Sequence, residues 1–220
     1  ELLTNYGEIF EVWFDGAKGA EAKAFEYDWQ RYYDLIRKLQ PNANIAVCGP
    51  DIRWIGNEAG KTRESEFSVV PEYLTKAETI EKNSQKSEKN TSHLQKLDSK
   101  TRDLGSRKAI KKENEFIWYP CEVCISMRDR WYYHKDDEYT AKTKDKLQKL
   151  YLASVGANCA FMLGVPPMKN GKFSDMDFQI MESFGLDLKR AYSYKVSHIG
   201  TIEASSCLSE EYSASNLFDE

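Results

Sequence analysis

Short apolar runs separated by helical periodicities divide most of the chain into alternating strands and helices. The runs have the length and composition of buried strands, and they are Phe10–Phe14, Asn44–Cys48, Phe116–Tyr119 and Ala160–Leu163. Apolar residues that recur three or four positions apart predict helices over 27–39, over 144–155 and from the capping residue Ser174 to about 192. Strands joined by helices of this length pair in parallel, so we expect an α/β fold.

Polar residues fall where predicted strands end, which favours a TIM-type (β/α)8 barrel over an open sheet. Asp15 closes the first predicted strand, the polar loop 51–66 follows the second, and Glu122 follows the third. In a barrel the chemistry is concentrated at these strand ends. A Rossmann-type sheet would need a glycine fingerprint after a strand, and the sequence has no G-x-G-x-x-G.

Composition narrows the classes of partner. Hydrophobic residues make up 41% and charged residues 30% of the 220 residues, which is ordinary for a globular protein. With a net charge of -4 and no basic stripe, nucleic acid is a poor partner, and no apolar run reaches the roughly 18 residues of a membrane span. The aromatic content of 13% supplies flat faces that suit sugars.

The polar segment 76–112 lacks a clean hydrophobic period, which predicts an insertion or mobile loop.

The cysteines give little support to a metal or redox site. There are five, and their spacing is not that of a small disulfide-bonded domain. Cys121-x-x-Cys124 has the spacing of a zinc or redox pair, but no second Cys or His pair accompanies it. We therefore expect no metal, no other cofactor and no disulfide framework.

Two carboxylates could perform glycoside hydrolysis. One would attack or activate water and the other would protonate the leaving oxygen, and Asp15 and Glu58 fit these roles by position. Glu64 and Glu66 lie on the same loop as Glu58 and are rival candidates for the acid/base. Composition and spacing alone also allow a simple turn at Asp15 and a surface charge at Glu58.

Three motifs occur in order: E-V-W-F-D-G-A at 11–17, P-D-I-R-W-I-G-N-E-A-G at 50–60 and W-Y-P-C-E at 118–122. Together they resemble the α-L-fucosidases of glycoside hydrolase family 29, particularly the branch that cleaves α-1,3/1,4-linked fucose. The resemblance covers 1–192 and implies the later part of the catalytic barrel. The segment 212–219 resembles the start of a β-sandwich, so 193–220 is expected to be a linker and the beginning of that domain.

The resemblance also implies residue roles. Asp15 matches the nucleophile of a retaining exo-α-L-fucosidase, and Glu58 matches its acid/base, which together hydrolyse a terminal fucose by double displacement. The residues that match or flank the substrate pocket are Trp13, Trp54, Glu122, Arg128 and Trp131. The implied substrate is a fucosylated oligosaccharide or glycoprotein glycan, and an extracellular or periplasmic location is expected.

The chain departs from the family pattern in several places. Cys124 stands where the pattern has Asp, Asp129 where it has Pro, and Arg130 and Cys159 where it has Gly. These changes leave two alternatives open: a catalytically impaired fucose-binding barrel, or a glycoside hydrolase for another sugar. We expect Cys159 to narrow the loop in which it lies.

The Asp15 strand matches the fourth strand of the family's barrel, so the first three strand-helix units are expected to be missing from this sequence. The absent N-terminal half of the barrel is then the partner of this piece. An open half-barrel exposes strand edges and apolar faces, and we expect it to be unstable alone.

Overall fold

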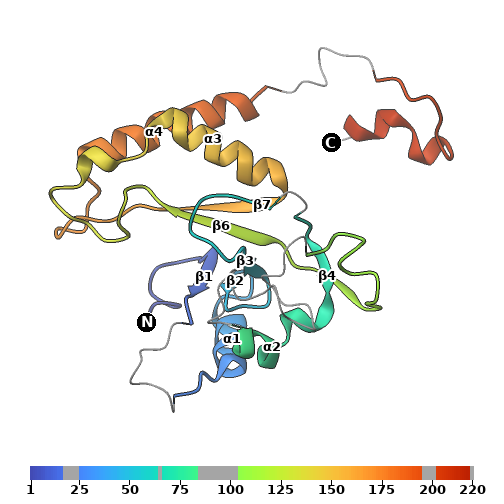
Figure 1. Ribbon diagram of the computed structural model, residues 1–220, viewed down its shortest axis with the longest axis horizontal. Coiled ribbons are helices and arrows are strands. Elements are labelled where there is room, and N and C mark those ends of the chain that lie inside the picture. Colours follow the sequence, from blue (N-terminus) through green and yellow to red (C-terminus); the bar gives the residue numbers. More distant parts are fainter. Residues whose placement is uncertain (17–24, 64–65, 84–103, 195–201, 219–220) are drawn as a thin grey trace.

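The computed structural model describes residues 1–16, 25–63, 66–83, 104–194 and 202–218. Its centre is a five-stranded parallel sheet in the order β1-β2-β3-β6-β7. The strands are β1 (Glu11–Phe14), β2 (Asn44–Val47), β3 (Ile52–Trp54), β6 (Cys121–Ser126) and β7 (Cys159–Gly164). The sheet curls, with α3 and α4 along β6 and β7 and with α1 beside β2 (Figure 1). The predicted α/β fold is confirmed as a parallel half-barrel.

The helices form close to where the periodicity places them. They are α1 (Trp29–Leu39), α2 (Ala77–Asn83), α3 (Lys144–Ser154) and α4 (Asp175–Tyr192). The side chains of Asp28, Thr143 and Ser174 accept hydrogen bonds from backbone amides of the first turns of α1, α3 and α4. Such caps satisfy donors that the helix itself leaves free, which fixes where each helix begins.

The two faces of the sheet carry different residues. On β1, Phe14 packs edge-on against Trp29 of α1 with ring centroids 5.5 Å apart, so this face meets the helix layer. Glu11 and Trp13 alternate with it and point to the inside of the curl, where Trp13 reaches Glu122 of β6. Asp15 comes directly after Phe14, the last residue of the strand.

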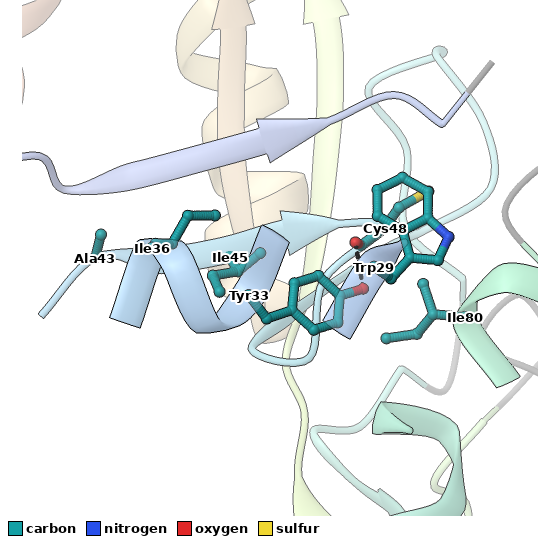
Figure 2. Close-up of a cluster of buried hydrophobic side chains, with 7 residues drawn as sticks. All are labelled: Trp29, Tyr33, Ile36, Ala43, Ile45, Cys48 and Ile80. Atoms are coloured by element: carbon teal, nitrogen blue, oxygen red, sulfur yellow. Dashed lines mark hydrogen bonds between the residues drawn. The ribbon is translucent and has the colours of Figure 1, made fainter. Parts of the chain in front are cut away.

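The helix-facing side of β2 has a well-packed core. Trp29, Tyr33 and Ile36 of α1 lie over Ile45 and Cys48, with Ile80 of α2 at the edge (Figure 2). The Tyr33 hydroxyl donates to the Cys48 carbonyl oxygen at 2.7 Å, as the dashed line in Figure 2 shows. This bond ties α1 to the end of β2, one residue beyond Val47, which has the unusual φ of 69°.

One predicted loop contains a strand, and one predicted strand forms outside the main sheet. The loop 51–66 contains the short strand β3, which pairs with both β2 and β6. The run at 116–119 gives β5 (Phe116–Trp118), which pairs antiparallel with β4 (Val69–Pro71) in a separate two-stranded sheet. The strand that enters the barrel is β6, directly after it, so Glu122 lies within a barrel strand and not beyond one.

The structure describes residues 76–83 and 104–112 of the polar segment 76–112. The segment begins after the short turn η1 (Glu72–Thr75) with α2, whose Ile80 is buried, and Leu104 is buried against Val70, Leu74 and Tyr119. Residues 84–103 lie outside the described part of the chain. The described ends of this segment thus belong to the core, and its reading as an insertion stays a prediction.

The C-terminal segment contains short 3-10 turns where it is described. These are η6 (Glu210–Tyr212) and η7 (Ala214–Phe218), and residues 195–201 and 219–220 lie outside the described part. The described residues 202–218 contain no strand. The expected β-sandwich therefore stays a prediction.

Two further short 3-10 turns lie on either side of α3. They are η3 (Glu138–Thr140) and η4 (Val155–Ala157).

β1 forms one edge of the sheet, and an apolar groove lies beside it. The groove has a volume of about 460 Å³ and is lined by Leu2, Leu3, Ile9, Glu11, Val12, Trp13, Phe14, Tyr32, Leu35 and Ile36. Phe10 at the start of β1 is 79% exposed and Leu2 is 76% exposed. An edge strand that borders such a surface is prone to self-association.

We therefore expect the 220-residue chain to aggregate when it is produced alone. Size-exclusion chromatography should show soluble aggregates, and a hydrophobic dye should bind without denaturant because the groove is open. A monomer that unfolds in one cooperative transition would contradict this prediction.

Candidate active site

A cluster of three side chains lies inside the curl of the sheet. The indole nitrogen Nε1 of Trp13 on β1 donates to Oε1 of Glu122 on β6 at 2.9 Å. The carboxyl group of Glu11, two residues before Trp13, also interacts with the Glu122 carboxyl group. Glu122 is only 2% exposed, whereas Trp13 is 40% exposed at the mouth of the curl. The buried carboxyl group of Glu122 thus holds the indole of Trp13, two residues before Asp15.

The two carboxyl groups have altered proton affinities. Burial, together with the nearby negative charge of Glu11, raises the pKa of Glu122 to about 7, and the hydrogen bond from Trp13 opposes this rise. Burial also raises the pKa of Glu11, while its hydrogen bond with Glu122 opposes the rise. Two acids this close cannot both ionise easily, so near neutral pH the pair retains a proton for much of the time.

Asp15 follows β1 directly and is exposed. Its backbone carbonyl oxygen lies 3.5 Å from Sγ of Cys48, which follows β2, so the ends of the two strands are joined. This position leaves the carboxylate accessible at the end of the strand, as the sequence predicts.

Glu58 is positioned by Trp131. Glu58 lies on the loop after β3, and its Oε2 accepts a hydrogen bond of 3.0 Å from Nε1 of Trp131, on the loop after β6. The indole ring lies over Gly164 at the end of β7, where a Cβ atom would come within 2.4 Å of the ring. Gly164 thereby makes room for the ring that holds Glu58.

Trp54 and Cys124 also face the inside of the curl. Trp54 pairs in register with Glu122, and its Nε1 donates to Sγ of Cys124 at 3.2 Å. Burial raises the pKa of the Cys124 thiol to about 11, so this group is neutral at ordinary pH. Where the family pattern has a carboxylate, this site has an uncharged acceptor.

Arg128 is not placed for a sugar contact. It is 1% exposed, and its guanidinium forms ion pairs with Asp177 at 2.7 Å and with Asp137 at 2.8 Å. The same group donates to the hydroxyl of Ser174, the cap of α4. We therefore correct its expected role. Arg128 joins the loop after β6 to the start of α4, and these contacts hold the loop in place.

The rival acid/base candidates differ in placement. Glu66 is 5% exposed and is held by Arg53 and Arg63, which makes it part of a buried ion cluster. Such an anion is already neutralised by two cations and has no access to a substrate. Glu64 lies outside the described residues. Glu58 is the accessible acid of this loop in the described part of the chain.

The other departures from the family pattern fit their surroundings. The backbone N–H of Asp129 donates to Oγ1 of Thr140 at 3.2 Å, a bond that a proline at this position could not make. Arg130 is not one of the described non-glycine residues with positive φ, so its backbone does not need glycine. Cys159 begins β7 instead of narrowing a loop, which corrects that expectation.

Sequence reasoning gave no role to Glu11, Cys48 or Gly164. Glu11 stands in the first quoted motif, and its alternation with Trp13 and Asp15 was the available signal.

The described residues contain no cluster of His, Cys, Asp and Glu suited to a metal ion. Cys121 and Cys124 lie three residues apart on β6 and point to opposite faces, so the zinc or redox pair is ruled out. None of the described helices is long and apolar enough to cross a membrane.

The parallel half-barrel and its accessible carboxylates define a (β/α)-barrel protein with the groups that glycoside hydrolysis needs. The family model of the α-L-fucosidases matches residues 1–191, and the chain belongs to that family. It is 33% identical over its whole length to α-L-fucosidase 1 of Arabidopsis thaliana, of which it covers 39%.

Solved structures agree with this assignment. A crystal structure from Bacteroides ovatus, described as that of a candidate α-L-fucosidase, is 38% identical with a TM-score of 0.71 over 88% of this chain and 32% of its own. A glycoside hydrolase 29 family member from an unknown rumen bacterium is 29% identical, with a TM-score of 0.58 over 85% of this chain and 32% of its own. The chain spans about two fifths of the length of the curated relatives it matches.

The raised pKa of Glu122 makes the stability of the protein depend on pH. The folded state binds this proton more tightly than the unfolded chain, so the stabilisation is complete below pH 4.5 and is lost as pH rises through about 7. Glu122→Gln keeps an acceptor for Trp13 and cannot ionise. The variant should be more stable than the wild type above neutral pH, by on the order of 1–3 kcal/mol.

Denaturant unfolding of the protein at its full encoded length, between about pH 4 and 8, measures this difference. Glu115→Gln is the matched control because Glu115 is exposed, and it should leave the pH slope unchanged. Equal pH slopes for Glu122→Gln and the wild type would contradict the prediction.

Proposed function

We propose that the protein encoded at full length is a retaining exo-α-L-fucosidase acting on terminal α-1,3/1,4-linked fucose. The family membership supports the reaction class, and the exposed Asp15 directly after β1 is the observation that carries the proposal. The resemblance of 50–60 to the α-1,3/1,4 branch supports the linkage. A fucosylated oligosaccharide or glycoprotein glycan is the proposed substrate, outside the cell or in the periplasm.

The proposed reaction has two displacements. The Asp15 carboxylate attacks the anomeric carbon of fucose while Glu58 donates its proton to the departing glycosidic oxygen. Glu58 then removes a proton from water, which attacks the glycosyl-enzyme and frees Asp15 with net retention. The hydrogen bond from Trp131 supports this role because it fixes the direction of the Glu58 carboxyl group.

The remaining candidates take supporting roles. The exposed indole of Trp13 offers an apolar face to the sugar, and buried Glu122 holds it in place. Trp54 lines the same interior, fixed by Cys124. The first strand-helix units of the barrel would complete the pocket on the open side of β1. A catalytically impaired fucose-binding barrel is the alternative, and the activity of the wild type decides between them.

Replacement of the nucleophile tests the proposal directly. Asp15→Asn keeps the size of the side chain but removes the attacking charge, so hydrolysis of an aryl α-L-fucoside by the full-length protein should fall by roughly 10³-fold or more. Asp34→Asn, on the exposed face of α1, is the matched control and should retain activity. A wild type that binds fucose without hydrolysing aryl fucosides would favour the binding alternative.

The acid/base role of Glu58 predicts a dependence on the leaving group. Glu58→Ala should lose about 10²- to 10⁴-fold on a fucosylated oligosaccharide but far less on an activated aryl fucoside, which needs little protonation. Azide should rescue the variant and give fucosyl azide with retained configuration, because it attacks the accumulated glycosyl-enzyme. Trp131→Phe keeps an aromatic ring at this position but removes the N–H donor. It should show a smaller difference in the same direction between the two substrates. Equal losses on both substrates would reassign the role to another acid, with Glu64 the next candidate.

A further inference from the structure

Two cysteines face each other across β6 and β7, on the side of the sheet away from the candidate active site. Cys121 and Cys159 are partners in the parallel register, and their Sγ atoms lie 2.9 Å apart. Their exposed fractions are 0% and 5%, and Ile55 and Val123 pack around them. Two thiols are therefore held in direct contact in the interior, with the buried charges of Arg53 and Glu66 close enough to act on both.

The backbone geometry suits a covalent bond. Neighbouring strands lie about 4.7–4.9 Å apart, which is within the roughly 4.4–6.8 Å Cα separation found across disulfides. Because both side chains leave the sheet on the same face, closing the bond needs a rotation of side chains and not a movement of the strands. Cys124 cannot compete, since it faces the interior and its Sγ accepts from Trp54.

We propose that Cys121 and Cys159 form a disulfide that joins β6 to β7. The proposal is independent of the fucosidase activity. It also gives one physical account of Cys159, which stands where the family pattern has glycine and which meets a cysteine on the neighbouring strand.

Formation of the bond is a thiol-disulfide exchange in two steps. In the folded protein the hydrogen bond between the two thiols lowers the pKa of Cys159 and raises that of Cys121, and burial adds to the rise at Cys121. The same steps apply whichever thiolate reacts first, for example that of Cys159. It attacks a sulfur of a disulfide oxidant, either a protein dithiol-disulfide or a small disulfide, and one oxidant thiol leaves.

The thiolate of Cys121 then attacks Sγ of Cys159 in this mixed disulfide and releases the second oxidant thiol. The two cysteines lose two electrons and two protons, and the oxidant gains both. Because the pair is buried in the folded protein, this exchange belongs to folding, before β7 closes on β6. Once formed, the bond is shielded from reductants by the same packing.

Peptide mapping without reduction tests the proposal on the full-length protein secreted into an oxidising medium. Free thiols are alkylated in denaturant, and the protein is then digested with trypsin. Cleavage leaves Cys159 in the peptide 150–169 and both Cys121 and Cys124 in the peptide 113–128. We expect these two peptides to be joined, with the loss of two hydrogens and with one alkylated cysteine in 113–128.

A Cys124→Ser variant identifies the linked residue. The joined peptides should persist in Cys124→Ser and disappear in Cys121→Ser. The reduced, unfolded protein refolded with glutathione disulfide should regain the same link. Full alkylation of both Cys121 and Cys159 after secretion, or a link through Cys124, would overturn the proposal.

Thermal unfolding gives a second measurement that does not depend on digestion. A reductant applied during unfolding should lower the Tm of the wild type by several degrees, because the link restricts the unfolded chain. The Cys121→Ser/Cys159→Ser double variant should show no such shift. If that variant fails to fold, the mapping of Cys124→Ser still decides the question.

Discussion

The hydrogen bond between Trp13 and Glu122 depends on the curvature of the whole sheet. It joins β1 to β6, which are separated by β2 and β3 in the strand order. In a flat sheet these strands would lie about 14 Å apart, too far for the two side chains to meet. Curvature therefore places a buried acid of one strand against the indole that flanks Asp15 of another. The site exists because the strands enclose an interior.

The sequence was informative where apolar patterns are local. The inward and outward alternation of β1 and the helical spacing of α1, α3 and α4 depend on residues within one element, and these elements were predicted within a few positions. β3 and β6 were missed or misplaced because each contains charges: Arg53 in β3 and Glu122 in β6. Both are buried against partners far along the chain, Glu66 and Trp13, so no local pattern reveals them.

The candidate site was also predictable only in part. The positions of Asp15 and Glu58 followed from motifs, whereas the groups that hold them did not. Trp131 was expected to touch substrate, and its contact with Glu58 arises only because Gly164 leaves space beneath the ring. The structural role of Arg128 could not be predicted either, because its partner Asp177 is 49 residues away in sequence. Removing such a buried charge partner typically costs about 3–5 kcal/mol, which is a strong constraint on this loop.

The replacement of a carboxylate by Cys124 changes the electrostatics of the interior more than its architecture. Glu122 and Glu58 both act on the Cys124 thiol, so position 124 lies within electrostatic reach of the two acids. A carboxylate here would add a further negative charge and raise the proton affinity of Glu122 still more. The neutral thiol accepts the Trp54 hydrogen bond without that charge. Cys124 thus lowers the negative charge of the interior without removing the acceptor that holds Trp54.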